Sequence, residues 1–400
     1  MRLIEDGYLE EFLSKRDLDI RKTNNARWID QKCTPDVLTI IADCVLEYLK
    51  DKEENQWFSA KDIWHHDYTV DNVVDIFQKP NPKDKAASNE YDKFFSQPLE
   101  LLAYSGVLIK KKVGVRNFYV LGDKGLLEEI SLSERKAFRF LVKYIIKVLT
   151  DSGMKHLFDD FFIKQDQNTY ERLKDSFTNI SKENTPINGS TECWRIFIKI
   201  INPLAYDKNL LGTERGRISK DVISYDMLMY NRDNFRDTFL RKPKGVTRGM
   251  HETSSMKKSK YINYLTTKAM KNAKQINRLY NLGLSEVDGD NELATEVHHI
   301  FPRLEFPKIA HFLENLINLT PNQHRNHAHP LGNYSIADRE YQKICLIAKI
   351  GTVKRSIEEN WGDYDFNNLL FVADHGYGTE IFSKIELYDY DEVINQINLI

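Results

Sequence analysis

The chain has 400 residues, 41% hydrophobic and 29% charged, which is the composition of an ordinary soluble protein of two or three domains. No apolar run approaches the roughly 18 residues of a membrane helix, and the N-terminus turns acidic at once, so we expect neither a membrane span nor a signal peptide. The four cysteines form no C-x-x-C pair. They fit free thiols in a reducing cytoplasm and argue against a cysteine-built zinc knuckle.

The formal net charge of −2 conceals two segments of opposite sign. Residues 241–278 hold eleven basic residues against one acidic residue, and residues 357–400 hold ten acidic residues against one basic residue. A local positive field attracts phosphates whatever the total charge of the chain, although such runs are often only solvated helix faces. We therefore expect nucleic-acid contacts from the basic segment, including Lys257, Lys258 and Lys260.

Residues 1–130 are predicted to form a compact helical domain that ends in a hairpin. Apolar periodicity predicts a helix from Pro35 to Tyr48, a short helix over 59–64 and a helix from Pro98 to Gly106, and two strands about Gly114 follow. Helices followed by a basic hairpin resemble a winged helix, whose hairpin commonly touches the DNA backbone. That resemblance assigns DNA contacts to four hairpin residues, and a plain scaffold is the alternative. The four are Lys110, Lys111, Lys112 and Arg116.

The rest of the chain is predicted to form two further domains. Residues 131–240 read as a helical middle domain. Residues 241–400 combine the basic segment, a histidine motif and the acidic tail. The polar stretch 283–291, rich in turn formers, is expected to be the last boundary before the motif. The fold class is therefore α+β and mostly helical.

The histidine motif begins with an adjacent pair. His298 and His299 lie in a segment with strand propensity, 295–301, which Pro302 ends. A second short strand, 316–320, follows after a loop. Because successive side chains of a strand point to opposite faces, the two histidines are expected to face different sides.

Further histidines follow the second strand. Pro321 opens a short predicted helix on which His324 and His327 stand at i and i+3, on one face. If His298 lies across from them, three imidazoles can converge on one divalent cation. His329 is expected to be an exposed bystander.

The other histidine of the pair, His299, is the candidate proton acceptor. His299 stays off the metal, and a free imidazole titrates near neutrality, which suits it to take a proton from water. The cation would stabilise charge on a phosphate and on the departing oxygen, and Arg303 or Arg325 would add to that stabilisation. The pattern predicts metal-assisted phosphodiester hydrolysis.

In residue types and spacing, this segment resembles the HNH, or ββα-metal, nuclease motif. The resemblance implies that His298 is a metal ligand and that His299 is the general base. It also implies that Asn315, sixteen residues after His299, holds the loop and the base in position. His324, nine residues later, is then a second ligand, and His327 matches the family's last histidine. The cysteine pairs that bind zinc in the family are missing, so the chain's own core must hold the fold.

The order of the three domains resembles that of restriction-type HNH endonucleases. It implies a site-specific endonuclease of double-stranded DNA, with a homodimer on DNA and a separately encoded DNA methyltransferase as associated partners. Mg²⁺ or Mn²⁺ is the expected cation, with Zn²⁺ or Ni²⁺ as alternatives in a purified sample.

Two other functions remain open from the sequence. One is a mobile-element or modified-DNA-dependent HNH nuclease. The other is a winged-helix DNA-binding regulator in which the histidines hold a structural metal. Structural sites are closed by four protein ligands, and the additional His299 favours the catalytic interpretation.

Overall fold

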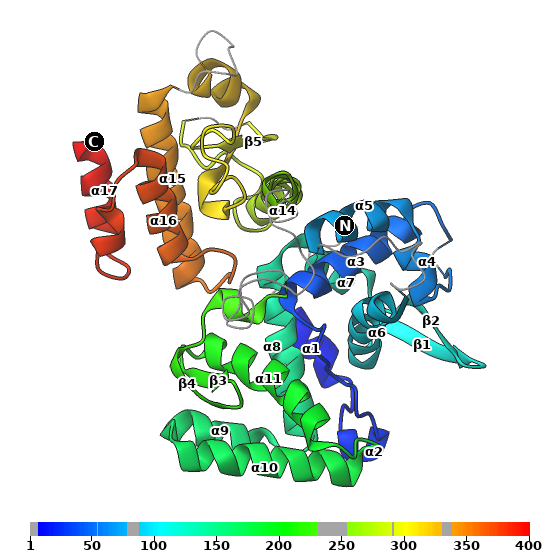
Figure 1. The fold of residues 1–400 in the computed structure, drawn as a ribbon. Helices are drawn as coiled ribbons and strands as arrows, with labels where there is room; N and C mark the ends of the chain where they lie inside the picture. Colours follow the sequence, from blue (N-terminus) through cyan, green and yellow to red (C-terminus); the bar gives the residue numbers. More distant parts are fainter. Residues whose placement is uncertain (1–6, 54, 78–87, 231–253, 290–291, 330–337) are drawn as a thin grey trace. The chain divides into compact units, whose positions relative to one another are not determined.

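The computed structural model describes residues 7–53, 55–77, 88–230, 254–289, 292–329 and 338–400 (Figure 1). The fold is mixed α+β and mostly helical, as predicted, and its described strands form three two-stranded antiparallel sheets. The chain divides into two compact units, Met1–Glu252 and Thr253–Ile400. Among the described residues, no helix is both long enough and apolar enough to cross a lipid bilayer.

The first unit contains, in chain order, α1 (Tyr8–Ser14), α2 (Ile20–Thr23), α3 (Pro35–Leu49), α4 (Ala60–Trp64), α5 (Asp67–Phe77), α6 (Ser88–Ser105), β1 (Leu108–Val113), β2 (Arg116–Leu121), α7 (Lys124–Leu132), α8 (Glu134–Asp151), α9 (Lys155–Lys164), α10 (Gln167–Asn184), α11 (Ser190–Asp207), β3 (Leu211–Glu214), β4 (Arg217–Val222) and the 3₁₀ turn η2 (Tyr225–Leu228). The helices predicted near 35–48 and 59–64 are confirmed as α3 and α4. Helix α3 is central, because it packs against α5, α6, α7 and α8.

Helix α6 begins ten residues earlier than the sequence pattern predicted, and Pro98 lies inside it. The physical reason is burial. Tyr91, Phe94 and Phe95 precede the proline and are almost completely buried. Their packing stabilises helical residues before Pro98, where the sequence pattern predicted that the helix would begin.

The predicted hairpin is confirmed as β1 and β2, with Gly114 in the left-handed region at φ 60°. It projects from the helices (Figure 1), and most of β1 is exposed. Phe58 adds a short third edge through a bridge to Tyr119, with the two backbone N–H···O bonds at 2.9 and 2.8 Å. Along the chain, α3 comes first, the Phe58 bridge follows it, and α4 to α6 precede the β1–β2 hairpin.

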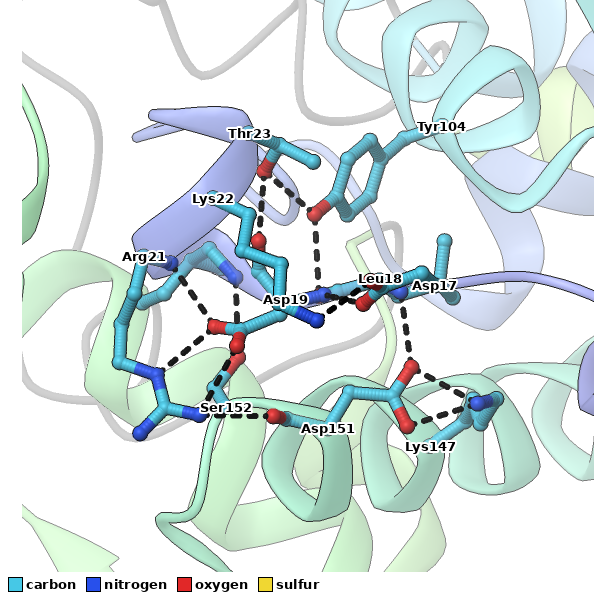
Figure 2. A network of polar contacts seen from close by, with 11 residues as sticks. Asp17, Leu18, Asp19, Arg21, Lys22, Thr23, Tyr104, Lys147, Asp151 and Ser152 are labelled. Carbon is cyan, nitrogen blue, oxygen red and sulfur yellow. Dashed lines mark hydrogen bonds and ion pairs between the residues drawn. The ribbon is translucent and has the colours of Figure 1, made fainter.

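The predicted first and second domains lie together in the first unit. Residue 130 falls inside α7, and α7 packs against both α3 and α8. The N-terminal segment is also tied to the end of α8, where Asp151 accepts from the Leu18 amide at 2.7 Å and Ser152 accepts from the Ile20 amide at 3.1 Å (Figure 2). The predicted boundary at 240/241 lies outside the described residues.

The second unit contains α14 (Ser254–Tyr280), β5 (Glu296–His299), the 3₁₀ turn η3 (Leu313–Asn315), β6 (Leu316–Leu319), the π-helical turn η4 (Gln323–Ala328), α15 (Arg339–Glu358), α16 (Phe366–Tyr377), the 3₁₀ turn η6 (Phe382–Lys384) and α17 (Tyr390–Leu399). One core cluster joins α14, both strands and the three C-terminal helices. The predicted acidic tail is thus not a bare tail, since α16 and α17 contribute Leu369, Val393 and Ile397 to this core.

A buried ion pair crosses the second unit. Glu286 lies in the stretch predicted as a boundary, yet its side chain is only 3% exposed, and that of its partner Lys349 on α15 is fully buried. The carboxylate also accepts from the Asn318 amide at 2.9 Å and from the Thr352 hydroxyl at 2.8 Å. Burial would raise the pKa of Glu286, but the charge and hydrogen bonds of Lys349 and the bonds from Asn318 outweigh burial and lower it.

Replacing Lys349 should strongly destabilise the second unit. Lys349→Met leaves the Glu286 carboxylate buried without its cation, which typically costs about 3–5 kcal/mol. Urea denaturation at pH 7 measures the loss, and Lys354→Met, an exposed lysine on the same helix, is the control.

The pH dependence distinguishes this cause from a simple packing defect. In the wild type the lowered pKa of Glu286 means that the pair's contribution is present above the usual value of 4.5 and is lost as pH falls through the folded value. In Lys349→Met the carboxyl is buried without a cation and takes up a proton more readily, so the deficit should shrink toward pH 4.5. A deficit that is the same at both pH values would contradict this account.

Candidate metal centre and catalytic histidine

The two predicted strands of the motif are confirmed and pair directly. In the antiparallel register, His298 lies opposite Ile317 and His299 opposite Leu316. Alternation along β5 places the two imidazoles on different faces, as the sequence predicted. His298 is 6% exposed, and His299 is half-buried.

Three imidazoles converge on the face of His298. Ring nitrogens of His298, His324 and His329 all lie within 4.8 Å of one another, and the ring centroids are 5.0–5.2 Å apart. Imidazole nitrogens bind a cation such as zinc at about 2.0–2.1 Å, so a shift of roughly 1 Å would bring all three to one ion. Within the described part of the chain, this is the one group of three or more such side chains with that geometry.

The third member of the cluster is His329, whereas the sequence pattern assigned His327. His327 is exposed, and its ring stacks on Tyr341 at 5.5 Å with the planes 27° apart. The prediction assumed an α-helix, in which residues three apart share a face. Residues 323–328 instead form a π-helical turn, which bonds residues five apart, and His329 stands five residues after His324.

The buried cluster favours neutral imidazoles. Burial lowers the pKa of His298 to about 3, and the neighbouring His324 and His329 add to this shift. Burial and His329 also lower the pKa of His324, while Glu296 acts in the opposite direction. A metal ligand must offer an unprotonated nitrogen, so the electrostatics of the cluster suit a cation site.

A single backbone contact orients the ring of His299. Its Nε2 lies 3.1 Å from the Ala310 carbonyl oxygen. A carbonyl can only accept, so Nε2 carries the proton and Nδ1 holds the lone pair. Burial lowers the pKa of His299, the bond to Ala310 raises it, and the nearby Arg303 lowers it again. The result is a neutral imidazole with one fixed basic nitrogen.

Asn315 ties the loop that follows His299 to the start of β6. It is fully buried, its Oδ1 accepts from the Phe301 amide at 2.8 Å, and its Nδ2 donates to the carbonyls of Phe301 and Ile309 at 3.1 and 3.2 Å. Its own backbone carbonyl accepts from Ile300 at 2.9 Å. These bonds hold the loop between His299 and Asn315, which carries Ala310.

Sequence reasoning missed several supporting residues. Gln342 in the first turn of α15 donates to the Ile300 carbonyl at 2.6 Å, next to His299. Ala310 acts through its backbone, so its side chain gives no signal in the sequence. His329 gives no α-helical signal in the sequence, because it follows the π-helical turn in extended backbone.

The structure divides the predicted DNA-binding residues. Arg303 and Arg325 are exposed beside His299 and His324 respectively, close enough to affect their pKa values. Lys257, Lys258 and Lys260 fall in α14, but their side chains lie outside what the structure describes.

The hairpin cations are also not equivalent. Lys110 pairs with Glu100 on α6 at 2.5 Å, and Lys111 lies over the Trp57 ring at 3.7 Å. Lys112 and Arg116 are exposed near the turn. The partly neutralised Lys110 is therefore the weakest of the four candidates for a DNA contact.

Comparison with protein-family models, curated proteins and solved structures finds no match to this chain.

Removing the Asn315 amide should loosen the loop without unfolding the sheet. Asn315→Leu keeps the branched shape of the side chain but leaves the amide and the carbonyl of Phe301 without these partners, at a cost of about 2–4 kcal/mol, whereas the Ile309 carbonyl keeps its bond from the Phe312 amide. Hydrogen–deuterium exchange should show faster exchange at Phe301, with the exposed Asn326→Leu as the control. Unchanged protection of Phe301 would contradict the role assigned to Asn315.

Proposed function

We propose that this protein is a metal-dependent DNA endonuclease whose second unit is a nuclease site of the HNH type. The observation that supports this proposal most is the placement of two histidines with different surroundings on β5. His298 joins two other imidazoles on one face, and His299 stands on the other with its basic nitrogen fixed by Ala310.

The residues fit hydrolysis of a phosphodiester. His299 Nδ1 takes a proton from a water molecule as the water oxygen bonds to phosphorus and the bond from phosphorus to the leaving oxygen breaks. A divalent cation held by His298, His324 and His329 would supply charge stabilisation at the phosphate and the leaving oxygen. Arg303, whose charge lowers the pKa of His299, would add to that stabilisation.

Three protein ligands favour a catalytic site over a structural one. Structural sites are typically closed by four protein ligands, whereas catalytic sites leave a position for water or substrate. Three imidazoles suit a transition metal better than Mg²⁺, which prefers oxygen. We therefore favour Mn²⁺ over Mg²⁺ as the working ion, with Zn²⁺ or Ni²⁺ as alternative occupants.

The first unit is the proposed reader of the DNA. The order of α3, the Phe58 bridge, α4 to α6 and the β1–β2 hairpin resembles a winged helix. Lys111, Lys112 and Arg116 on the hairpin are the proposed backbone contacts, since their exposed side chains can reach phosphates. The assignment of reading and cutting to different units supports a site-specific, restriction-type enzyme. We further propose that it acts as a dimer, because cutting both strands with single-metal sites needs two active sites or sequential nicking, and that a separate methyltransferase protects the host DNA.

Cleavage of plasmid DNA tests the proposal. Wild type with Mn²⁺ or Mg²⁺ should give discrete fragments, and EDTA should stop cleavage. His299→Ala should lower the rate by about 10²–10⁴-fold, the usual contribution of a general base. His327→Ala is the matched control, because the exposed His327 lies outside the cluster, and it should cut within about threefold of wild type.

The alternatives predict other results. No cleavage with Mn²⁺, Mg²⁺, Zn²⁺ or Ni²⁺, together with retained DNA binding, would favour the regulator with a structural metal. Cleavage only of modified DNA would favour the modification-dependent nuclease. Equal rates for wild type and His299→Ala would refute the assignment of the base.

A further inference from the structure

The first unit has a cleft of about 620 Å³ at the foot of the hairpin. The end of α1, the end of α6 and the start of β1 surround it, and Arg16, Tyr104 and Ile109 are among its lining residues. Its volume falls in the range of ligand-binding pockets, roughly 300–1,000 Å³. The nuclease proposal gives this cleft no role.

The guanidinium of Arg16 is held in this cleft with few of its donors used. It lies between the Phe12 ring, 4.3 Å from Cζ to the centroid, and Gly106. Gly106 has φ +85°, a conformation that favours glycine, and a Cβ there would come within 2.1 Å of Arg16 Cζ, so a larger residue would push the guanidinium out of this position. Of five N–H donors, one makes a hydrogen bond to a described residue, Nη2 to the Gly106 carbonyl at 3.4 Å, and the buried Nε has no acceptor there.

The other charges of the cleft are already paired. Lys15 pairs with Glu11 at 2.6 Å, and Lys110 pairs with Glu100 at 2.5 Å. The one lining carboxylate, Asp17, pairs with Lys22 at 2.6 Å. Arg16 makes no ion pair with a described residue, so the cleft offers one uncompensated positive charge. That charge matches one phosphodiester, which carries a single negative charge.

Apart from Asn25, the rest of the wall consists of apolar residues and Tyr104. Ala103, Leu108 and Ile109 line it beside Tyr104. The Tyr104 hydroxyl donates to the Leu18 carbonyl at 3.0 Å and lies 2.8 Å from the Thr23 hydroxyl (Figure 2). Because residues 18–20 are bonded in turn to the end of α8, the tyrosine ring is held in place before any ligand arrives.

We propose that this cleft binds one unpaired nucleotide of a DNA strand. Arg16 holds the phosphodiester, and the base lies against Tyr104 and Ile109, since bases stack on aromatic and apolar side chains. A backbone contact alone needs no cavity of this size, whereas an unpaired base does. The inference rests on the DNA-binding role proposed for the first unit and is independent of the histidine site.

Fluorescence anisotropy in EDTA tests the proposal without cleavage. The probes are two labelled duplexes of the same sequence, one perfect and one with a single unpaired nucleotide. The full chain should bind the second about tenfold more tightly. Arg16→Gln and Ile109→Glu should each remove that preference, and Ile109 is 53% exposed, so its replacement should leave the fold intact.

Arg172→Gln is the matched control. It removes the same charge from an exposed pair with Asp160 in the same unit, outside the cleft, and should keep the preference. Equal binding of the two duplexes by wild type, or a preference that survives Arg16→Gln, would overturn the proposal. Displacement of the probe by thymidine 5′-monophosphate at similar concentrations would also overturn it, because the ligand would then be a free nucleotide.

The binding assay in EDTA and the plasmid cleavage assay with metal, performed on the same protein preparations, distinguish this proposal from the nuclease proposal. Metal-dependent plasmid cleavage without a preference for the unpaired nucleotide would refute the cleft alone. A preference that depends on Arg16, without cleavage under any metal, would refute the nuclease site and leave the cleft supported.

Discussion

The pairing of β5 with β6 is the constraint on which the site depends. It sends His298 and His299 to opposite faces and places Asn315 directly before β6, where its side chain can hold the loop that follows His299. The pairing is itself anchored. Glu286 accepts from the backbone and side chain of Asn318 on β6 and pairs with Lys349 on α15. The candidate cation site and the proposed base therefore share one short strand that buried hydrogen bonds hold in register.

Local patterns predicted much of this arrangement. Alternation along a strand separates the two histidines, and the prolines mark the strand ends. Both inferences need only the chain near the motif, and the structure has both strands there. In the first unit the periodic helix α3 and the glycine turn of the hairpin were predictable for the same reason.

What the sequence could not supply depends on long-range contacts. Residues 323–328 form a π-helical turn, and His329, not His327, joins the cluster. The α-helical spacing of the sequence gave no indication of this turn. The sequence around Glu286 is typical of a polar boundary. Nothing near Glu286 in the sequence indicates that it pairs in the core with Lys349, sixty-three residues later. The length of α6 depends on the burial of Tyr91 and Phe95, which overrides the local preference of Pro98. Arg16 looks like any surface arginine until Gly106 and Phe12 are seen around it.

The proposed cation site on one face of β5 depends on which histidines bind the metal. Electron spin-echo spectroscopy of metal-free protein loaded with one equivalent of Mn²⁺ reports nitrogen couplings from imidazole ligands. We expect couplings from histidine nitrogens in wild type and in His327→Ala, with fewer in His329→Ala and His298→Ala. Couplings that are lost in His327→Ala and kept in His329→Ala would contradict this expectation, as would Mn²⁺ bound without any nitrogen coupling.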